Sequence, residues 1–263
     1  MKLTVLADNN TLIDQYFLAE PALSFYIEDS GKKILFDAGY SDVFIKNAAK
    51  LGIDLKTLDY VVISHGHLDH TRGLNHLIKL YKKSKFKKPK LIAHPAALMP
   101  KFFGKQQIGS NLSPKTMTKY FDVILTDKPY NLTKNLIFLG AVPRKNNFEI
   151  CNICGDTLQD DSALAFRGKG GLTIITACSH AGIVNICEHA KNICRANKIA
   201  AVIGGLHLLG PAPKQISQTV KYLKKQKLQK LYPCHCVDLN SKIKLSASAP
   251  LGEVGSGLKL EFK

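Results

Sequence analysis

The sequence contains no long apolar run. Of its 263 residues, 45% are hydrophobic, yet no stretch approaches the roughly 20 consecutive apolar residues that a membrane-spanning helix needs. The first residues, Met1 to Asp8, reach an aspartate too early for a secretory leader. We therefore expect a first β-strand at the N-terminus, no membrane association and a cytoplasmic location.

Cysteine is missing from the first half of the chain. All seven cysteines lie between Cys151 and Cys236, and an odd number argues against a secreted disulfide framework. Reduced thiols are normal in the cytosol. Cys151 and Cys154, with Cys234 and Cys236, raise the alternative of a structural four-thiolate zinc site. The Cys-x-Cys spacing and the histidine within it count against that alternative.

Acidic residues are few. There are 20 Asp and Glu against 37 Lys and Arg, which gives a formal charge of +17 and favours anionic partners. Much of the surplus lies in Lys79–Lys90 and Lys221–Lys230. A solvated helix face is the favoured interpretation, and a nucleic-acid patch is the alternative. Neither stretch interleaves aromatics as a single-strand binding platform does. An anionic small molecule is thus the expected partner, and the sequence leaves the oligomeric state open.

The chain also lacks internal repeats, low-complexity tracts and long linkers. Its length suits one large domain or two small ones. Apolar runs bounded by turn residues predict strands at 3–6, 23–27, 33–36, 60–63, 172–176, 199–203 and 228–232, with helices at 43–51, 183–196 and 216–225. We expect one α/β domain with halves at roughly 1–140 and 160–263 and an irregular excursion near 144–161. Two mixed sheets would face each other, with helices outside.

What the chain does have is a cluster of metal ligands at the end of a predicted strand. His65, His67, Asp69 and His70 follow the β-branched run Tyr60–Ile63 directly. Imidazole and carboxylate together suit zinc, and also iron or manganese. Four such groups in six residues are too crowded for one ion. The pattern predicts two adjacent ions that take further ligands from elsewhere in the chain.

Three more histidines follow predicted strands. His180, His207 and His235 each come directly after an apolar run, and open α/β sheets bind their ligands beyond the carboxyl ends of strands. We expect His180 and His235 to bind metal. For His207, a ligand role and a role in contacting the substrate or a ligand both stay open.

Other polar residues near these strand ends have two interpretations each. Asp37 ends a strand before glycine, where it is either an outer-shell partner of a ligand imidazole or an ordinary turn residue. Asp161 is either a carboxylate ligand or a turn residue. Cys178 is expected to line the pocket, and Cys187 and Cys194, seven apart on a predicted helix, are expected to face the core.

These residues resemble the metallo-β-lactamase superfamily. Its signature, His-x-His-x-Asp-His, is matched in full by His65, His67, Asp69 and His70. Much of the chain is similar to a subgroup that includes archaeal proteins named as synthases of methanopterin formation. The matching stretches are Glu20–Ser24, Ile34–Gly39, Ser64–Leu74, Cys178–Asn185, Gly204–Leu208 and His235–Cys236. The resemblance implies an αβ/βα four-layer sandwich with a dinuclear site at one edge of the two sheets.

The sequence departs from that family at several positions. Cys178-Ser179-His180 occupies the place of the bridging aspartate, so His180 stands as a substitute terminal ligand. Pro21, Arg72 and Val237-Asp238 replace histidine, glycine and Thr-Gly of the subgroup. Arg72, beside the cluster, would grip an anionic group.

The resulting hypothesis is a metal-dependent hydrolase, with two zinc ions as the expected cofactor. One ion would be held by His65, His67 and a distant histidine, and the other by Asp69, His70 and His235. Asp69 would also orient the attacking water, as the catalytic residue. The alternatives are a pterin-related synthase that uses the metal as a Lewis acid, a metal-dependent phosphodiesterase or nuclease, and a non-catalytic binding protein on the same fold.

Overall fold

The computed structural model describes residues 1–149 and 158–263. They form two compact units, Met1–Asp127 with Val254–Phe262, and Lys128–Glu253 with Lys263. Part of the predicted excursion, with Cys151 and Cys154, lies outside the described residues. The single domain inferred from the sequence stays a prediction.

The first unit is built on a seven-stranded sheet in the order β15-β1-β2-β3-β4-β5-β8. Its strands are β1 (Lys2–Ala7), β2 (Ser24–Asp29), β3 (Lys32–Phe36), β4 (Tyr60–Ile63), β5 (Lys90–Ala93), β8 (Asp122–Leu125) and β15 (Lys259–Glu261). From β3 to β8 neighbouring strands run parallel, and the remaining pairs are antiparallel. A separate two-stranded ribbon consists of β6 (Phe102–Phe103) and β7 (Gln106–Gln107).

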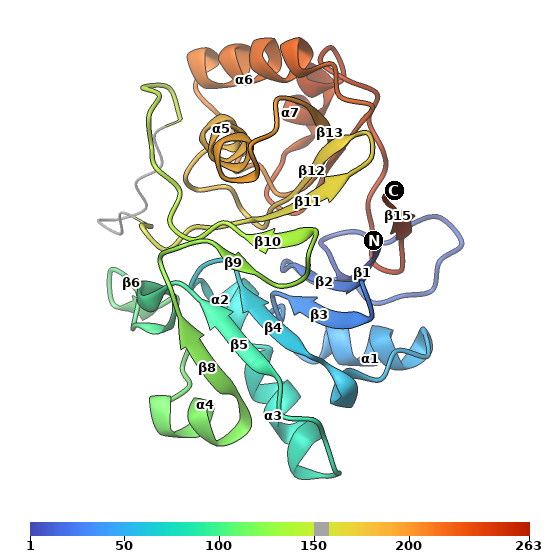
Figure 1. Ribbon diagram of the computed structural model, residues 1–263, viewed down its shortest axis with the longest axis vertical. Helices are drawn as coiled ribbons and strands as arrows, with labels where there is room; N and C mark the ends of the chain where they lie inside the picture. Colours follow the sequence, from blue (N-terminus) through green and yellow to red (C-terminus); the bar gives the residue numbers. More distant parts are fainter. Residues whose placement is uncertain (150–157) are drawn as a thin grey trace. The chain divides into compact units, whose positions relative to one another are not determined.

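Helices cover one face of this sheet (Figure 1). They are α1 (Val43–Lys50), α3 (Leu74–Lys82) and α4 (Pro114–Tyr120). The unit also contains the short helix α2 (Leu68–Thr71), which follows β4, and the 3-10 turns η1 (Leu55–Thr57) and η2 (Pro95–Leu98). Alternate strand residues such as Leu35, Val61 and Leu91 join Phe44 of α1 and Tyr81 of α3 in one buried cluster. Every second residue of the strands thus packs against residues that recur along one face of a helix.

The second unit has a six-stranded sheet in the order β14-β13-β12-β11-β10-β9. Its elements are β9 (Tyr130–Asn131), β10 (Leu136–Phe138), β11 (Leu164–Gly168), β12 (Gly171–Ile175), α5 (Ile183–Cys194), β13 (Ile199–Gly204), α6 (Pro213–Gln226), β14 (Lys230–Pro233) and α7 (Leu239–Leu245). β12, β13 and β14 run parallel, and the other pairs are antiparallel.

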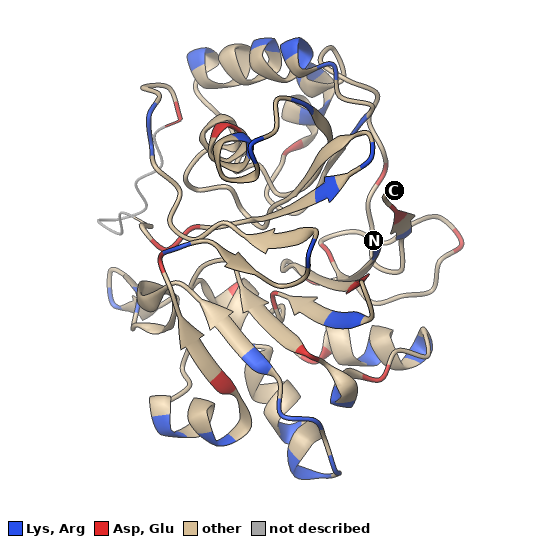
Figure 2. Cartoon of the chain, viewed as in Figure 1, with Lys and Arg blue, Asp and Glu red and all other residues tan. Residues whose placement is uncertain are grey.

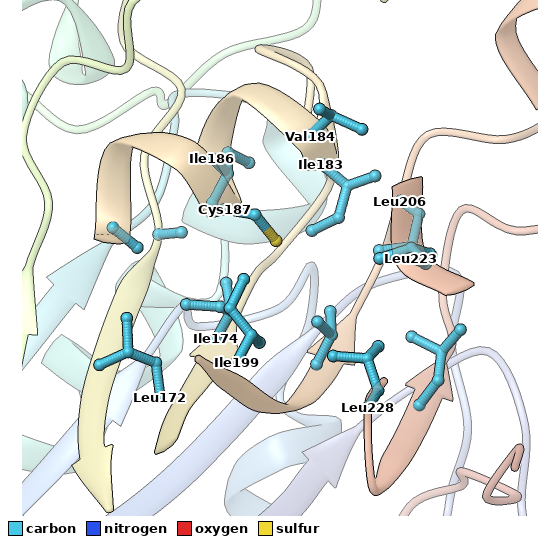
Figure 3. Packing of buried hydrophobic residues seen from close by; sticks show 14 of the residues in the cluster. Leu172, Ile174, Ile183, Val184, Ile186, Cys187, Ile199, Leu206, Leu223 and Leu228 are labelled. Atoms are coloured by element: carbon cyan, nitrogen blue, oxygen red, sulfur yellow. The ribbon is translucent and has the colours of Figure 1, made fainter. Parts of the chain in front are cut away.

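The core of the second unit forms between α5 and the parallel strands (Figure 3). Ile183, Ile186, Cys187 and Ala190 recur at the spacing of one helix face and are fully buried or nearly so. Figure 3 shows the Cys187 sulfur directed from α5 toward the strands. Cys187 and Cys194 belong to this cluster, which confirms that they face the core.

The parallel strands decide where the polar residues meet. Within each unit, adjacent parallel strands end at one edge of the sheet, so the segments that follow them are neighbours. The residues after β3 and β4 include Asp37 and His65, and those after β12, β13 and β14 include His180, His207 and His235. Each sheet therefore gathers its candidate ligands at a single edge.

The fold class expected from the sequence, mixed α/β with two large mixed sheets and helices, is confirmed. Whether the sheets face each other stays a prediction. Among the described residues, no helix is both long enough and apolar enough to cross a bilayer.

Gly73, between α2 and α3, should be intolerant of any side chain. A Cβ there would lie 1.8 Å from the carbonyl oxygen of Ala38, and the Gly73 N–H already donates to the Gly39 carbonyl at 3.0 Å. We expect Gly73→Ala to lower the free energy of unfolding by about 1–3 kcal/mol, because overpacking must displace backbone. Urea unfolding measures the loss. The control is Gly170→Ala, where the nearest atom would be 3.4 Å away; an equal effect in both variants would contradict the account.

Candidate metal centre

The first unit places four metal-ligand side chains between β4 and α2. His65 lies in the turn that follows β4, His67 has extended backbone angles as the N-cap of α2, and Asp69 and His70 lie within that short helix. His65 and His70 are fully buried, and His67 is 8% exposed. Because these four residues lie within six positions of the chain, all four side chains start from a small region.

The donor atoms of this segment occur in pairs. His65 Nε2 lies 3.2 Å from His67 Nδ1, and His70 Nε2 lies 3.5 Å from Asp69 Oδ2. Two nitrogens bound to one tetrahedral zinc at 2.0–2.1 Å are separated by roughly 3.3 Å. Both pairs thus have the separation of two ligands on a common ion, and the donor set fits metal binding.

The electrostatics of the segment favour a positive charge. Burial alone would lower the pKa of His70, but the negative charges of Asp69 and Asp37 outweigh it and raise that pKa to about 10. A cation bound beside these carboxylates satisfies the same demand as a proton on the imidazole. Metal binding at such a site therefore competes with protonation.

Asp37 fixes the orientation of the segment from outside. Its Oδ1 accepts the Ser64 N–H at 2.8 Å, and its Oδ2 accepts the Ser64 hydroxyl at 2.7 Å and lies 2.8 Å from His70 Nδ1. The carboxylate is fully buried. Because Nδ1 of His70 is engaged, Nε2 is the nitrogen presented to a metal, which is the contact an outer-shell partner makes.

Two residues that the sequence analysis did not single out also contribute. The Ser64 hydroxyl lies 2.9 Å from His65 Nδ1 as well as bonding Asp37, so it orients a second imidazole; its position directly before His65 was the available signal. Lys101 is 7% exposed, and its Cε would lie 2.6 Å from a Cβ built on Gly66. No local sequence pattern predicts this lysine beside the histidines.

The second unit gathers its candidate residues at the ends of β12, β13 and β14. Hydrogen bonds join the loops, because the hydroxyls of Thr176 and Ser179 both donate to the Gly205 carbonyl, at 2.9 and 2.7 Å. Ser179, His207 and His235 all have φ near +50 to +60°. Non-glycine residues in this region cost of order 1–3 kcal/mol each, and such strain clusters at functional sites.

The imidazoles and thiols of this edge lie close together. The Cys178 sulfur is within 4.8 Å of a ring nitrogen of His180 and of one of His235, and the rings of His180 and His207 are 4.3 Å apart between centroids. The Cys236 sulfur accepts the His207 N–H at 3.3 Å. Burial raises the pKa of the Cys236 thiol, but hydrogen bonds and the neighbouring histidines hold it well below its usual value.

Asp161 and Arg72 have specific partners. Asp161 Oδ2 accepts the Ala181 N–H at 2.7 Å, beside His180, and burial raises the pKa of Asp161 to about 7. Arg72 Nη2 donates to the Gln107 carbonyl at 2.9 Å, and its guanidinium carbon is 5.7 Å from the centre of the Tyr40 ring. Asp161 thus supports the turn that carries His180.

Comparisons with known proteins agree with the signature. Residues 19–131 match the sequence model of the metallo-beta-lactamase superfamily. An uncharacterized protein of Methanocaldococcus jannaschii is 33% identical over 251 residues, which covers 92% of this chain and 93% of that protein. A second protein of that organism, named 7,8-dihydropterin-6-methyl-4-(beta-D-ribofuranosyl)-aminobenzene-5'-phosphate synthase, is 30% identical over 262 residues, with 92% of this chain and 89% of the relative covered.

Solved structures agree as well. One described as a metal-dependent hydrolase of the beta-lactamase superfamily is 31% identical, with a TM-score of 0.84 and coverage of 99% of this chain and 98% of that one. A diphosphatase of the PhnP family is similar in fold, at 20% identity, a TM-score of 0.60, and coverage of 100% and 98%. The signature residues, the two mixed sheets and these likenesses establish that the chain belongs to the metallo-β-lactamase superfamily.

Proposed function

We propose that this protein is a metal-dependent hydrolase with two zinc ions that acts on an anionic small molecule. The observation that carries the proposal is the pairing of donor atoms in the first unit, 3.2 Å between His65 and His67 and 3.5 Å between Asp69 and His70. These are the separations of ligands that share an ion.

Each pair leaves its ion short of ligands, because a catalytic zinc takes three protein ligands and one open position. We propose that His180 completes the set of His65 and His67, and that His235 completes the set of Asp69 and His70. His207, whose ring packs on His180, is assigned to the substrate side or to orienting His180. The solved structure at 31% identity, described as a metal-dependent hydrolase, supports the class of activity.

Zinc, when bound, supplies Lewis-acid polarisation and brings the pKa of water at the site toward 7. Asp69 would accept a hydrogen bond from the attacking water and orient it toward the substrate. Asp37 holds His70 in the required tautomer, and Ser64 does the same for His65. The first unit also supplies the cations Arg72 and Lys101 near the histidine segment, and these favour a phosphorylated or carboxylated substrate.

A second candidate is a pterin-related synthase, favoured by the relative at 30% identity that carries that name. The two functions use the same ligands and differ in whether water or a carbon or nitrogen nucleophile attacks. Product analysis with a dihydropterin pyrophosphate separates them, because only a synthase yields a joined product. If that product forms and no ester is hydrolysed, the hydrolase proposal is wrong.

Nucleic acid is not the favoured partner. The lysines of α6, blue in Figure 2, lie on exposed positions of an amphipathic helix, which is the usual arrangement of a solvated face. A cytoplasmic location belongs to the proposal too, since none of the described cysteines forms a disulfide, which is the state expected in a reducing compartment.

His67→Ala and Asp69→Ala should each abolish hydrolysis and leave the protein folded, because each removes a donor from a pair without touching the core. Turnover on a panel of phosphodiesters, lactones and thioesters, with zinc content by elemental analysis, measures the effect. His76→Ala, on the outer side of α3, is the matched control. Retained activity in either ligand variant would refute the mechanism.

Asp37→Asn should weaken zinc binding by about 10–100-fold, the usual cost of losing an outer-shell partner. Both oxygens of Asp37 accept hydrogen bonds, and an amide replaces one acceptor with a donor. Competition against a chromophoric chelator gives the affinity. Asp42→Asn, at a surface ion pair with Lys46, is the control, and equal affinities in the two variants would show that Asp37 does not position the ligands.

A further inference from the structure

The ligands so far assigned to the second unit are all neutral. His180 and His235 contribute imidazoles, and the place of a bridging carboxylate is taken by Cys178-Ser179-His180. Asp161 is an acidic residue near His180, but its Oδ2 accepts the backbone N–H of Ala181 at 2.7 Å. Two divalent ions close together repel each other, and a negative donor near both would offset that repulsion.

The Cys178 side chain lies near both His180 and His235, and its thiolate form is a negative donor. It is 4% exposed, and His180 and His235 are 2% and 9% exposed. Its sulfur lies within 4.8 Å of a ring nitrogen of each histidine. A zinc bound at 2.3 Å from sulfur and 2.1 Å from nitrogen allows those atoms to lie up to about 4.4 Å apart, so a small side-chain adjustment brings each pair onto one ion.

The other thiols of the second unit have different surroundings. The Cys236 sulfur accepts the His207 N–H at 3.3 Å and lies 3.5 Å from the Cys178 carbonyl oxygen. These contacts connect Cys236 to the backbone of the two neighbouring loops. Cys187 and Cys194 are residues of α5 that belong to the buried hydrophobic cluster, and Figure 3 shows the Cys187 sulfur directed toward the strands. Among the described cysteines, Cys178 is the one whose sulfur groups within 4.8 Å with ring nitrogens of both His180 and His235.

We propose that Cys178, as a thiolate, is a metal ligand shared between the ion bound by His180 and the ion bound by His235. The inference rests on the proposed function and adds the anionic ligand of the second unit. On binding, the S–H bond breaks, its proton passes to solvent, and a sulfur lone pair binds the ion. A soft sulfur donor also favours zinc over manganese, which is one of the metals that the sequence left open.

Cobalt(II) substitution tests the inference by spectroscopy, because cobalt bound to thiolate has an intense near-ultraviolet charge-transfer band that nitrogen and oxygen ligands do not produce. The band should be present in the cobalt-loaded wild type, in Cys236→Ser and in the core control Cys194→Ala, and absent in Cys178→Ser. The Cys178→Ser variant should also lose more zinc affinity than the roughly 10–100-fold that outer-shell changes cost. A band that persists in Cys178→Ser, or disappears in Cys236→Ser alone, overturns the inference.

A measurement on the unaltered protein removes any dependence on variant folding. The cadmium-113 resonance of the cadmium-loaded wild type should lie in the downfield region of thiolate-bound cadmium. A shift typical of nitrogen and oxygen ligands alone overturns the role of Cys178. If the wild type then still binds zinc and hydrolyses the ester panel, the proposed function stands without it. A wild type that binds no metal overturns both.

Discussion

The buried carboxylate of Asp37 is the constraint on which the first half of the site depends. It lies 27 residues from Ser64 and 33 from His70 in sequence, yet bonds both at 2.7–2.8 Å. The residue has φ of +58°, so the chain adopts a strained turn to aim the carboxylate inward. The neighbouring Ala38 N–H bonds the His70 carbonyl at 2.9 Å. Side-chain and backbone hydrogen bonds thus join the end of β3 to Ser64 and to α2.

The second unit reaches a similar result with different means. Here the hydroxyls of Thr176 and Ser179 join the turn after β12 to the turn after β13 through the Gly205 carbonyl, and the Asp161 carboxylate accepts the Ala181 N–H beside His180. Gly205 itself has no room for a side chain, because a Cβ would lie 2.1 Å from the Ala177 carbonyl oxygen and 2.6 Å from the Cys236 sulfur. The packing that excludes a Cβ is what brings the turn after β12 close to the turns after β13 and β14. Rigid loops of this kind preorganise ligands before an ion binds.

The strands and the types of ligand residue could be predicted from the sequence, because apolar runs and metal ligands are local signals. Runs such as Ile199–Ile203 fell within β13, and every expected histidine followed its strand. Short helices were harder to predict from the sequence. α4 is marked by the Ser113 cap and Pro114, and α7 by the Asp238 cap, but seven residues carry too little periodicity to outweigh a loop interpretation. The contacts of Ser64, Lys101 and Cys178 depend on tertiary packing, which spacing along the chain does not encode.

We propose that two ions are bound by His65, His67, Asp69 and His70 together with His180 and His235. A crystal of zinc-loaded protein, with anomalous differences measured on both sides of the zinc edge, tests it most directly. The account predicts two peaks, one at about 2.0–2.1 Å from nitrogens of His65, His67 and His180 and one at a similar distance from nitrogens of His70 and His235. Peaks elsewhere on the protein, with none at these histidines, would contradict it.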